Sequence, residues 1–322
     1  MTVLVTGCAG FIGYHTCLRL LKKNKKVYGV DNLNDYYDVS LKKTRIKKLK
    51  EISSNFYFYK KDLSNYNFLY SLFKSKKIKY IVHLAAQAGV RHSIKNPRVY
   101  LNSNINGFFN IIECAREFKI KHCIFASTSS VYGDLNKFPS KEIDNTDHPL
   151  SFYAATKKSN EVMAYSYSAI YNIPFTGLRF FTVYGPLGRP DMALFKFTKS
   201  IVEDKKVYLF NSGKHVRDFT YVDDVAESIL RLINKPSQKK IPYDIFNISS
   251  NSPKSLKFFL NLIEKETNKS SKKHNTNKQI GDVVKTHGQN KKLLSKIKYK
   301  PKIKLDLGIK KFTKWYKSFY KN

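Results

Sequence analysis

Cysteines, acidic residues and long apolar runs are all scarce in this 322-residue sequence. The four cysteines lack the spacing of metal ligands, so we expect no metal site and interpret all four as reduced. No stretch approaches the roughly 18 consecutive apolar residues that a membrane span requires. Met1 leads directly into the apolar run Val3–Val5 without a charged leader and cleavage site, which favours a cytoplasmic protein.

Acidic residues number 24 against 59 lysines and arginines, a formal net charge of +35. Such a charge would attract nucleic acid or another polyanion through counterion release. A compositional bias of the source genome is the simpler explanation, because nearly all of the excess is lysine, spread from Lys22 to Lys321. We therefore do not expect a nucleic-acid partner, and the dense run Lys269–Lys304 is the first place to look for a polyanion site.

Short β-branched runs alternate with helical patterns in the first half of the sequence, which predicts a parallel sheet covered by helices on both faces. The expected elements are Val3–Thr6, Phe11–Lys23, Val27–Val30, Phe56–Tyr59, Tyr66–Lys74, Tyr80–Leu84, Pro97–Phe118 and Cys123–Ser127. The alternation breaks up after Pro186. The later expected elements are a helix near Ala193–Glu203, a strand at Val207–Phe210, a helix ending near Asn234 and an amphipathic helix through Phe312, Trp315, Tyr316 and Phe319.

We predict an α/β fold, a doubly wound parallel sheet of the Rossmann type with a smaller α/β lobe towards the C-terminus. Residues 1–180 would form the cofactor-binding domain, with 215–245 returning to it. Residues 181–322 would mainly form the smaller, substrate-binding lobe.

A glycine-rich segment, Thr6–Gly13, follows the first predicted strand. Gly7 permits the tight turn, Gly10 lets the backbone approach a diphosphate, and Gly13 lets helix pack on strand. Asp31 ends the second predicted strand, where its carboxylate would accept hydrogen bonds from a ribose diol and repel a 2′-phosphate. The pattern predicts NAD rather than NADP. The other predicted cofactor contacts are Phe11, Ile12, Asn32, Asp62, Leu63, Leu84, Ala85, Ala86 and Ser127. Core packing alone would also explain the segments Asp62-Leu63 and Leu84–Ala86.

Tyr153 and Lys157 are four residues apart and therefore share one face of a predicted helix. Tyrosine ionises at about pH 10, and a neighbouring ammonium group that stabilises the phenolate would let it accept a proton near neutrality. The hydroxyl-rich segment Ser127–Ser130 ends a predicted strand and would hold a substrate oxygen against that phenolate. With the glycine-rich segment, this pair predicts oxidation of a sugar hydroxyl by a bound nicotinamide cofactor.

These motifs resemble the extended short-chain dehydrogenase/reductase superfamily and, within it, the UDP-glucuronate 4-epimerase family. Three long segments carry the closer resemblance: Asp31–Asp38, Ala85–Arg91 and Arg179–Ala193. The resemblance covers nearly the whole chain. It implies interconversion of UDP-glucuronate and UDP-galacturonate through a 4-keto intermediate that turns in the site, in a homodimer that supplies precursors for polysaccharide biosynthesis.

The resemblance also implies roles for individual residues. Tyr153 and Thr128 would be catalytic at the sugar, and Lys157 would support both Tyr153 and the cofactor ribose. Arg189 would lie at the uronate carboxylate, and Arg217 at the UDP diphosphate, which a guanidinium fork suits. The remaining implied substrate contacts are Gln87, Arg91, Ser129, Ser130 and Thr182.

Three alternatives stay open. The related UDP-glucuronate decarboxylases carry Glu at the position of Ser130, and epimerases of UDP-glucose or UDP-N-acetylglucosamine commonly carry Asn at that of Thr182. A catalytically idle, basic nucleotide-binding protein would be supported by the charge alone. One segment also departs from the family. After Gly281-Asp282-Val283, relatives usually have a Thr-Tyr-Ala-Asp-like stretch, whereas this chain has Lys285–Lys291, which puts the uridine contacts in question.

Overall fold

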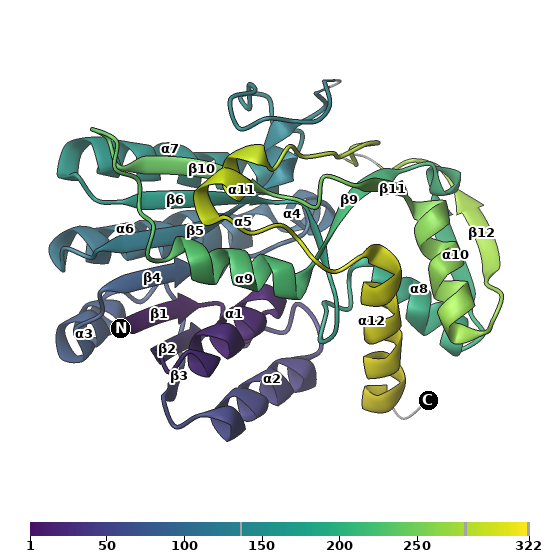
Figure 1. Ribbon diagram of the computed structural model, residues 1–322, viewed down its shortest axis with the longest axis horizontal. Helices are drawn as coiled ribbons and strands as arrows, with labels where there is room; N and C mark the ends of the chain where they lie inside the picture. The colour runs from purple at the N-terminus through teal and green to yellow at the C-terminus, as the bar shows by residue number, and fades with distance from the viewer. Residues whose placement is uncertain (136, 280–281, 321–322) are drawn as a thin grey trace.

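A seven-stranded parallel sheet forms the centre of the computed structural model, which describes residues 1–135, 137–279 and 282–320 (Figure 1). The strand order is β10-β6-β5-β4-β1-β2-β3. The strands are β1 (Thr2–Thr6), β2 (Lys26–Asp31), β3 (Phe56–Lys60), β4 (Tyr80–His83), β5 (His122–Thr128), β6 (Phe175–Phe180) and β10 (Tyr243–Ile248). The order reverses between β1 and β4, so the predicted doubly wound α/β fold is confirmed.

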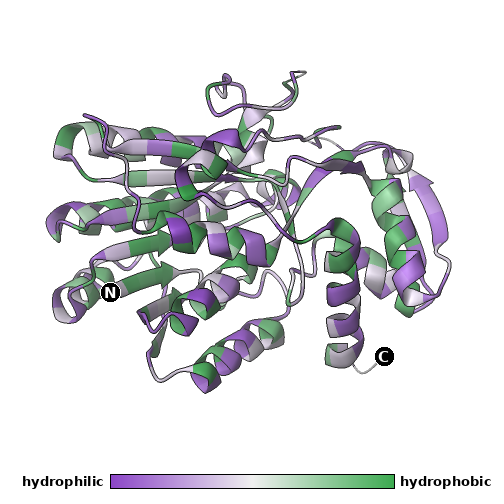
Figure 2. Cartoon of the chain, in the orientation of Figure 1, coloured by the Kyte–Doolittle hydropathy of each residue, from purple (hydrophilic) through white to green (hydrophobic). Residues whose placement is uncertain are grey.

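Helices cover both faces of this sheet because successive strand residues point to opposite sides. Val3 and Val5 of β1 join one hydrophobic cluster, and Leu4 joins the other. The first cluster lies under α1 (Phe11–Lys22), α2 (Val39–Ile52), α9 (Val222–Leu232) and α11 (Lys291–Ile297). The second lies under α3 (Tyr66–Lys76), α6 (Gly107–Glu117) and α7 (Phe152–Tyr171). Figure 2 shows the central strands as mostly hydrophobic and the outer helix faces as mostly polar.

A smaller lobe packs beside the carboxyl ends of the central strands (Figure 1). Its own core includes Phe219 and Phe259, whose rings stack with centroids 4.2 Å apart. The lobe consists of α8 (Ala193–Val202), α10 (Leu256–Thr267), α12 (Leu305–Tyr320), a sheet of β7 (Thr182–Tyr184), β9 (Val216–Tyr221) and β11 (Pro253–Ser255), and a sheet of β8 (Lys206–Phe210) and β12 (Lys272–Thr276).

The return of the chain to the main sheet differs from the predicted span 215–245. Strand β9 belongs to the smaller lobe, so the return begins at α9 and continues through β10. Helix α11 returns a second time, and Leu293 and Ile297 pack in the first hydrophobic cluster.

The predicted helix Pro97–Phe118 is wrong as one continuous element. The structure divides it into α5 (Pro97–Tyr100), a π-helix over Leu101–Asn106 and α6. Helix α2 and the short α4 (Val90–Lys95) were not predicted. The apolar period of α2 is weak, because one of its buried positions is occupied by an arginine, Arg45. Within the described residues, no helix is long and apolar enough to cross a membrane.

Candidate active site

One cavity of about 780 Å³ lies between the carboxyl ends of the central strands and the smaller lobe. Each residue predicted to bind cofactor or substrate, or to act in catalysis, lines this cavity. A volume of this size is at the upper end of the range for ligand pockets. In the ranges that the structure describes, no cluster of three His, Cys, Asp or Glu side chains is suited to a metal ion.

The glycine-rich loop joins β1 to α1 at the point where the strand order reverses. Gly7 has φ +68°, and a Cβ on it would lie 2.7 Å from the backbone nitrogen of Ala85. A Cβ on Gly13 would lie 2.0 Å from the carbonyl oxygen of Gly7. Gly10 caps α1 without a side-chain hydrogen bond, so the N–H groups of the first turn remain available to an anion. The loop therefore fits a dinucleotide diphosphate.

Two carboxylates lie in the cavity at the carboxyl ends of neighbouring strands, Asp31 as the last residue of β2 and Asp62 two residues after β3. Asp31 accepts hydrogen bonds from the N–H groups of Ala9 (3.1 Å) and Leu33 (2.9 Å), while burial raises its pKa. Burial also raises the pKa of Asp62, but hydrogen bonds from Ser64 and Asn32 outweigh it and hold that pKa below its ordinary value. Carboxylates at these positions are suited to ribose hydroxyls, so the residues present fit NAD.

Tyr153 lies in the first turn of α7, whose N-terminus is capped by Ser151. Burial raises the pKa of Tyr153, whereas the charge of Arg189 and a hydrogen bond with Thr128 lower it. Burial lowers the pKa of Lys157 to about 7, against an opposing effect of Glu161. Arg189 and Thr128 are thus the groups that oppose the effect of burial on the pKa of Tyr153.

Lys157 is held by a chain of amides that begins in the π-helix. Its ammonium group donates to Asn160 Oδ1 (3.0 Å), and Asn160 Nδ2 donates to the carbonyl of Asn104 (2.7 Å). The side chain of Asn104 bonds Gln87 through both its Oδ1 and its Nδ2, and donates to Thr156 Oγ1 (3.0 Å). π-Helical turns frequently occur at functional sites, and this one brings the Asn104 carbonyl to α7. Neither Asn104 nor Asn160 was predicted.

A buried ion pair lies directly behind the hydroxyl-rich segment. Arg179 donates to Glu161 through Nε (2.9 Å) and Nη2 (2.8 Å), and both side chains are 5% exposed. Ser127 Oγ donates to the same carboxylate (2.6 Å). Thr128 Oγ1 instead donates to Ser130 Oγ (3.2 Å), and both hydroxyls line the cavity. Glu161 was not predicted, although its position four residues after Lys157 on the same helix face was a usable signal.

Both arginines that the sequence assigned to substrate anions contact carboxylates. Arg189 donates to Asp191 through Nε (3.0 Å) and Nη2 (2.5 Å), and Asp191 holds the pKa of Arg189 above its ordinary value despite burial. Arg217 Nη2 donates to Asp282 (2.9 Å), whose other oxygen lies 3.7 Å from Arg91. Burial lowers the pKa of Arg217, and Asp282 opposes that effect.

The atypical segment Lys285–Lys291 connects the smaller lobe to the loop that follows β5. Thr286 donates its N–H to the carbonyl of Val216 (3.0 Å), and the His287 carbonyl accepts from the N–H of Ser140 (2.8 Å). Of this segment only Thr286 lines the cavity, together with Asp282 and Val283, whereas Gly281 lies outside the described residues. The segment that differs from the family therefore mainly makes contacts between the lobes and contributes little to the cavity lining.

Known proteins resemble the chain over its whole length. The sequence pattern of a family described as "NAD dependent epimerase/dehydratase family" matches residues 3–249. The chain is 49% identical to Protein CapI of Staphylococcus aureus, covering 100% of both. It is 42% identical to the UDP-glucuronate 4-epimerase of Thermodesulfobacterium geofontis, covering 98% of this chain and 95% of the relative.

A solved structure shares the fold closely. The crystal structure of UDP-glucuronic acid 4-epimerase from Bacillus cereus, in complex with UDP-glucuronic acid and NAD, has a TM-score of 0.93 and 34% identity. The match covers 99% of this chain and 100% of that chain. The predictions of an enzyme of the epimerase class and of NAD as its cofactor are confirmed. A Rossmann sheet, a glycine loop that fits a dinucleotide and matches of this length together show that the chain belongs to the NAD-dependent epimerase/dehydratase family.

Proposed function

We propose that the chain interconverts UDP-glucuronate and UDP-galacturonate as an NAD-dependent 4-epimerase. The proposal rests on one observation: a tyrosine and lysine pair lines the same cavity as an arginine and hydroxyl groups that suit a uronate carboxylate. The pair is Tyr153 and Lys157, and the carboxylate group would meet Arg189 and Ser130. The relatives that are named UDP-glucuronate 4-epimerase support the same substrate.

Tyr153 takes the proton of the sugar 4-hydroxyl as the C4–H bond breaks and C4 becomes a ketone. NAD, held by Gly7–Gly13, Asp31 and Lys157, would supply the hydride acceptor and later the hydride donor. Thr128 holds the reacting oxygen and, with the charge of Arg189, favours the phenolate of Tyr153 against the cost of burial. The 4-keto sugar would turn in the site and present its other face to the hydride that the reduced cofactor would supply, and Tyr153 would give back the proton, which regenerates NAD.

Retention of the sugar carboxylate distinguishes this reaction from its nearest alternative. A 4-ketouronate is a β-keto acid and loses carbon dioxide when its C5–C6 bond aligns with the ketone π-system. Arg189 and Ser130 bind the carboxylate without repelling it and keep it out of that alignment. A decarboxylase would instead carry a glutamate at position 130, which this chain lacks.

Product analysis tests the proposal. Purified protein incubated with UDP-glucuronate should give UDP-galacturonate of unchanged mass in the NMR spectrum, with no carbon dioxide released. Carbon dioxide as the main product would overturn epimerisation in favour of decarboxylation. Turnover of UDP-glucose or UDP-N-acetylglucosamine at a higher kcat/KM than UDP-glucuronate would overturn the substrate assignment, and no turnover of any of these would favour the idle nucleotide-binding alternative.

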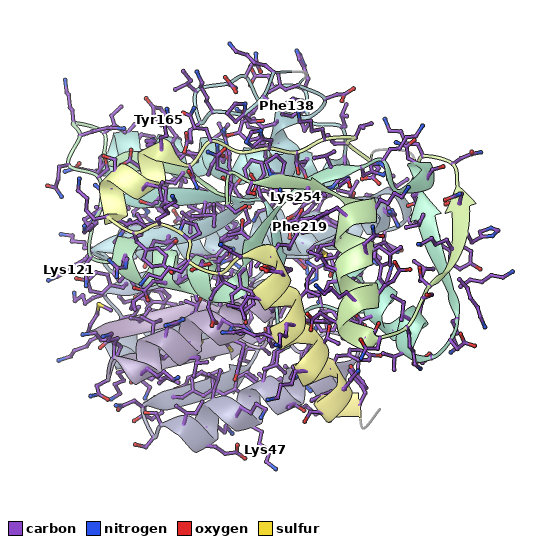
Figure 3. All side chains as sticks on the ribbon, turned by 45° about the vertical axis from the view of Figure 1, so that its right-hand side comes forward. Lys47, Lys121, Phe138, Tyr165, Phe219 and Lys254 are labelled. Atoms are coloured by element: carbon purple, nitrogen blue, oxygen red, sulfur yellow. The ribbon has the colours of Figure 1, made fainter. Side chains whose placement is uncertain are left out.

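The proposed enzyme is a homodimer in which α6 and α7 pack against the same helices of a second copy. Apolar side chains on these helices are exposed, including Phe109 (45%), Val162 (56%) and Tyr165 (49%). Of these, Tyr165 is labelled in Figure 3. An apolar face of this kind is typical of a site of association. Light scattering should give a dimer mass, and Val162→Lys with Tyr165→Lys should shift it towards the monomer. An unchanged mass would contradict this interface.

We place the reaction in the cytoplasm, as a supply of UDP-galacturonate for polysaccharide biosynthesis. All four cysteines are free and buried, which fits a reducing compartment. Fractionation of the source cells should recover the protein with cytoplasmic markers.

A further inference from the structure

Arg45 of α2 is fully buried, yet it does not line the cavity. Its Nη1 donates to the carbonyl of Ala9 in the glycine-rich loop (2.7 Å) and to the hydroxyl of Tyr37 (2.7 Å). Its Nη2 donates to the carbonyls of Leu187 (2.7 Å) and Gly188 (3.3 Å). One guanidinium therefore joins the loop that fits the NAD diphosphate to the loop that leads into the substrate-facing arginine.

The acceptors of Arg45 are three main-chain carbonyls and a phenol, none of which carries a charge. Burying a cation against uncharged acceptors costs free energy, so an arginine in this position indicates that its hydrogen-bond geometry is needed. Its charge acts on the cofactor side, because it lowers the pKa of Asp31, although by less than burial raises it. The position thus places fixed positive charge beside the site of an anionic cofactor.

The loop held by Arg45 has a conformation that needs support. Leu187 has φ +57°, in the left-handed region that non-glycine residues adopt only when surrounding contacts over-determine them. Three consecutive carbonyls of this loop point at cofactor-side helices. Pro186 accepts from His15 Nε2 of α1 (3.0 Å), and Leu187 and Gly188 accept from Arg45. Arg189 follows directly, so its direction depends on these contacts.

We propose that Arg45 is a positioning residue that couples the two halves of the site, fixing the glycine-rich loop for NAD and the Leu187–Gly188 loop for Arg189. The NAD half is independent of the proposed function. The substrate half rests on it, because it assumes that Arg189 binds the carboxylate of UDP-glucuronate.

Two readouts on Arg45→Gln separate positioning from a merely structural role. We expect the Kd for NAD, titrated calorimetrically into stripped full-length protein, to rise on the order of 10-fold or more, because charge-assisted hydrogen bonds of this kind are lost. We expect KM for UDP-glucuronate, at saturating NAD, to rise by a similar factor because Arg189 is displaced, with a smaller fall in kcat because Arg189 also lowers the pKa of Tyr153. In an Arg189→Ala background the KM effect of Arg45→Gln should vanish, because both changes act through one group.

Arg45→Lys and two controls complete the design. Arg45→Lys keeps the positive charge but loses the forked geometry of the guanidinium group. The affinity for NAD should therefore partly recover, while KM for UDP-glucuronate stays high. This variant replaces Arg45→Gln if the latter does not fold. His15→Ala removes the contacts with the Pro186 carbonyl and the Asp223 carboxylate, neither of which lies in the glycine-rich loop, and should leave the Kd for NAD unchanged. Arg231→Gln removes an exposed charge that pairs with Glu227 and should change neither readout.

Folded Arg45 variants with wild-type NAD affinity and wild-type KM would overturn the inference. Failure of the wild-type protein to turn over UDP-glucuronate would instead contradict the proposed function. The NAD titration would then still decide the first half of the inference.

Discussion

Replacing Arg189 by alanine tests the recognition of the sugar carboxylate. In the structure, the Arg189 guanidinium makes two hydrogen bonds to the Asp191 carboxylate, of 3.0 and 2.5 Å, with 23% of its side chain exposed. This geometry shows that the guanidinium group suits a carboxylate bound side-on, and a uronate carboxylate would compete with Asp191 for it. A uronate carboxylate that binds in the same way would lose this contact in Arg189→Ala, whereas a neutral sugar would not.

The magnitude follows from the strength of such contacts. A hydrogen bond to a charged group contributes about 1.5–3 kcal/mol, which corresponds to a loss of roughly 10- to 150-fold in kcat/KM. UDP-glucose has no carboxylate, so its kcat/KM should fall by a clearly smaller factor, which reflects only the loss of the Arg189 charge near Tyr153. Asp191 loses its partner in this variant and would repel the uronate, so Arg189→Ala with Asp191→Asn should recover part of the loss.

The assay measures kcat/KM for both UDP-sugars by coupled product detection in the wild type and the two variants. Equal losses for UDP-glucuronate and UDP-glucose would refute the carboxylate assignment, since the effect would then be general damage to the site. An unchanged kcat/KM for UDP-glucuronate would refute it more directly.

Three further predictions concern the helix that carries the tyrosine and lysine pair. Tyr153→Phe should lower kcat by about 10²- to 10⁴-fold at unchanged NAD content, as expected for loss of an acid-base group, and a loss below tenfold would contradict that role. Glu161→Gln leaves a buried guanidinium unpaired and should cost about 3–5 kcal/mol of unfolding free energy in urea titrations, against a much smaller loss for the more exposed Glu113→Gln. The pKa of Lys157 is lowered to about 7, so between pH 8 and 10 the unfolded chain binds a proton that the folded chain does not. Stability of the NAD-free protein should therefore rise with pH by roughly 1.4 kcal/mol per unit more than in Lys157→Met. Equal slopes would count against this, and the neighbouring Lys158→Met should keep the wild-type slope.

The residues that line the cavity could be predicted because each belongs to a local sequence pattern of known geometry. A glycine with φ +68° at position 7 and a carboxylate at the end of β2 each follow from what a diphosphate and a ribose require at the ends of parallel strands. Tyr153 and Lys157 share a face because helical spacing dictates it. These residues lie in the cavity, where the sequence pattern places them.

The residues that hold these side chains in place could not be predicted, because their contacts join segments that are distant in the sequence. Asn104 reaches α7 only because a π-helix interrupts a pattern that reads as one regular helix. Arg45 occupies a position in α2 where helical periodicity predicts an apolar residue. Its main-chain acceptors include the carbonyls of Ala9, 36 residues away, and Leu187, 142 residues away. Backbone acceptors leave no trace in side-chain patterns, so neither contact has a local signature.

The basic side chains behind the net charge of +35 lie both on the outer surface and in the cavity. Lysines such as Lys47, which is 80% exposed, and Lys121 extend from the outside of the molecule (Figure 3). Salt screens exposed charges over roughly 8 Å at physiological ionic strength, so these lysines contribute little to the field inside the cavity. Within the cavity, Arg189 and Arg217 face Asp191 and Asp282. Basic side chains still outnumber acidic ones in its lining, which also includes Lys42, Lys61, Lys95 and Lys196. Under the proposed function, a uronate and a diphosphate would compete with these carboxylates for the same guanidinium groups. Affinity for the substrate would therefore depend on two arginine–aspartate pairs within a cavity that is itself rich in basic side chains.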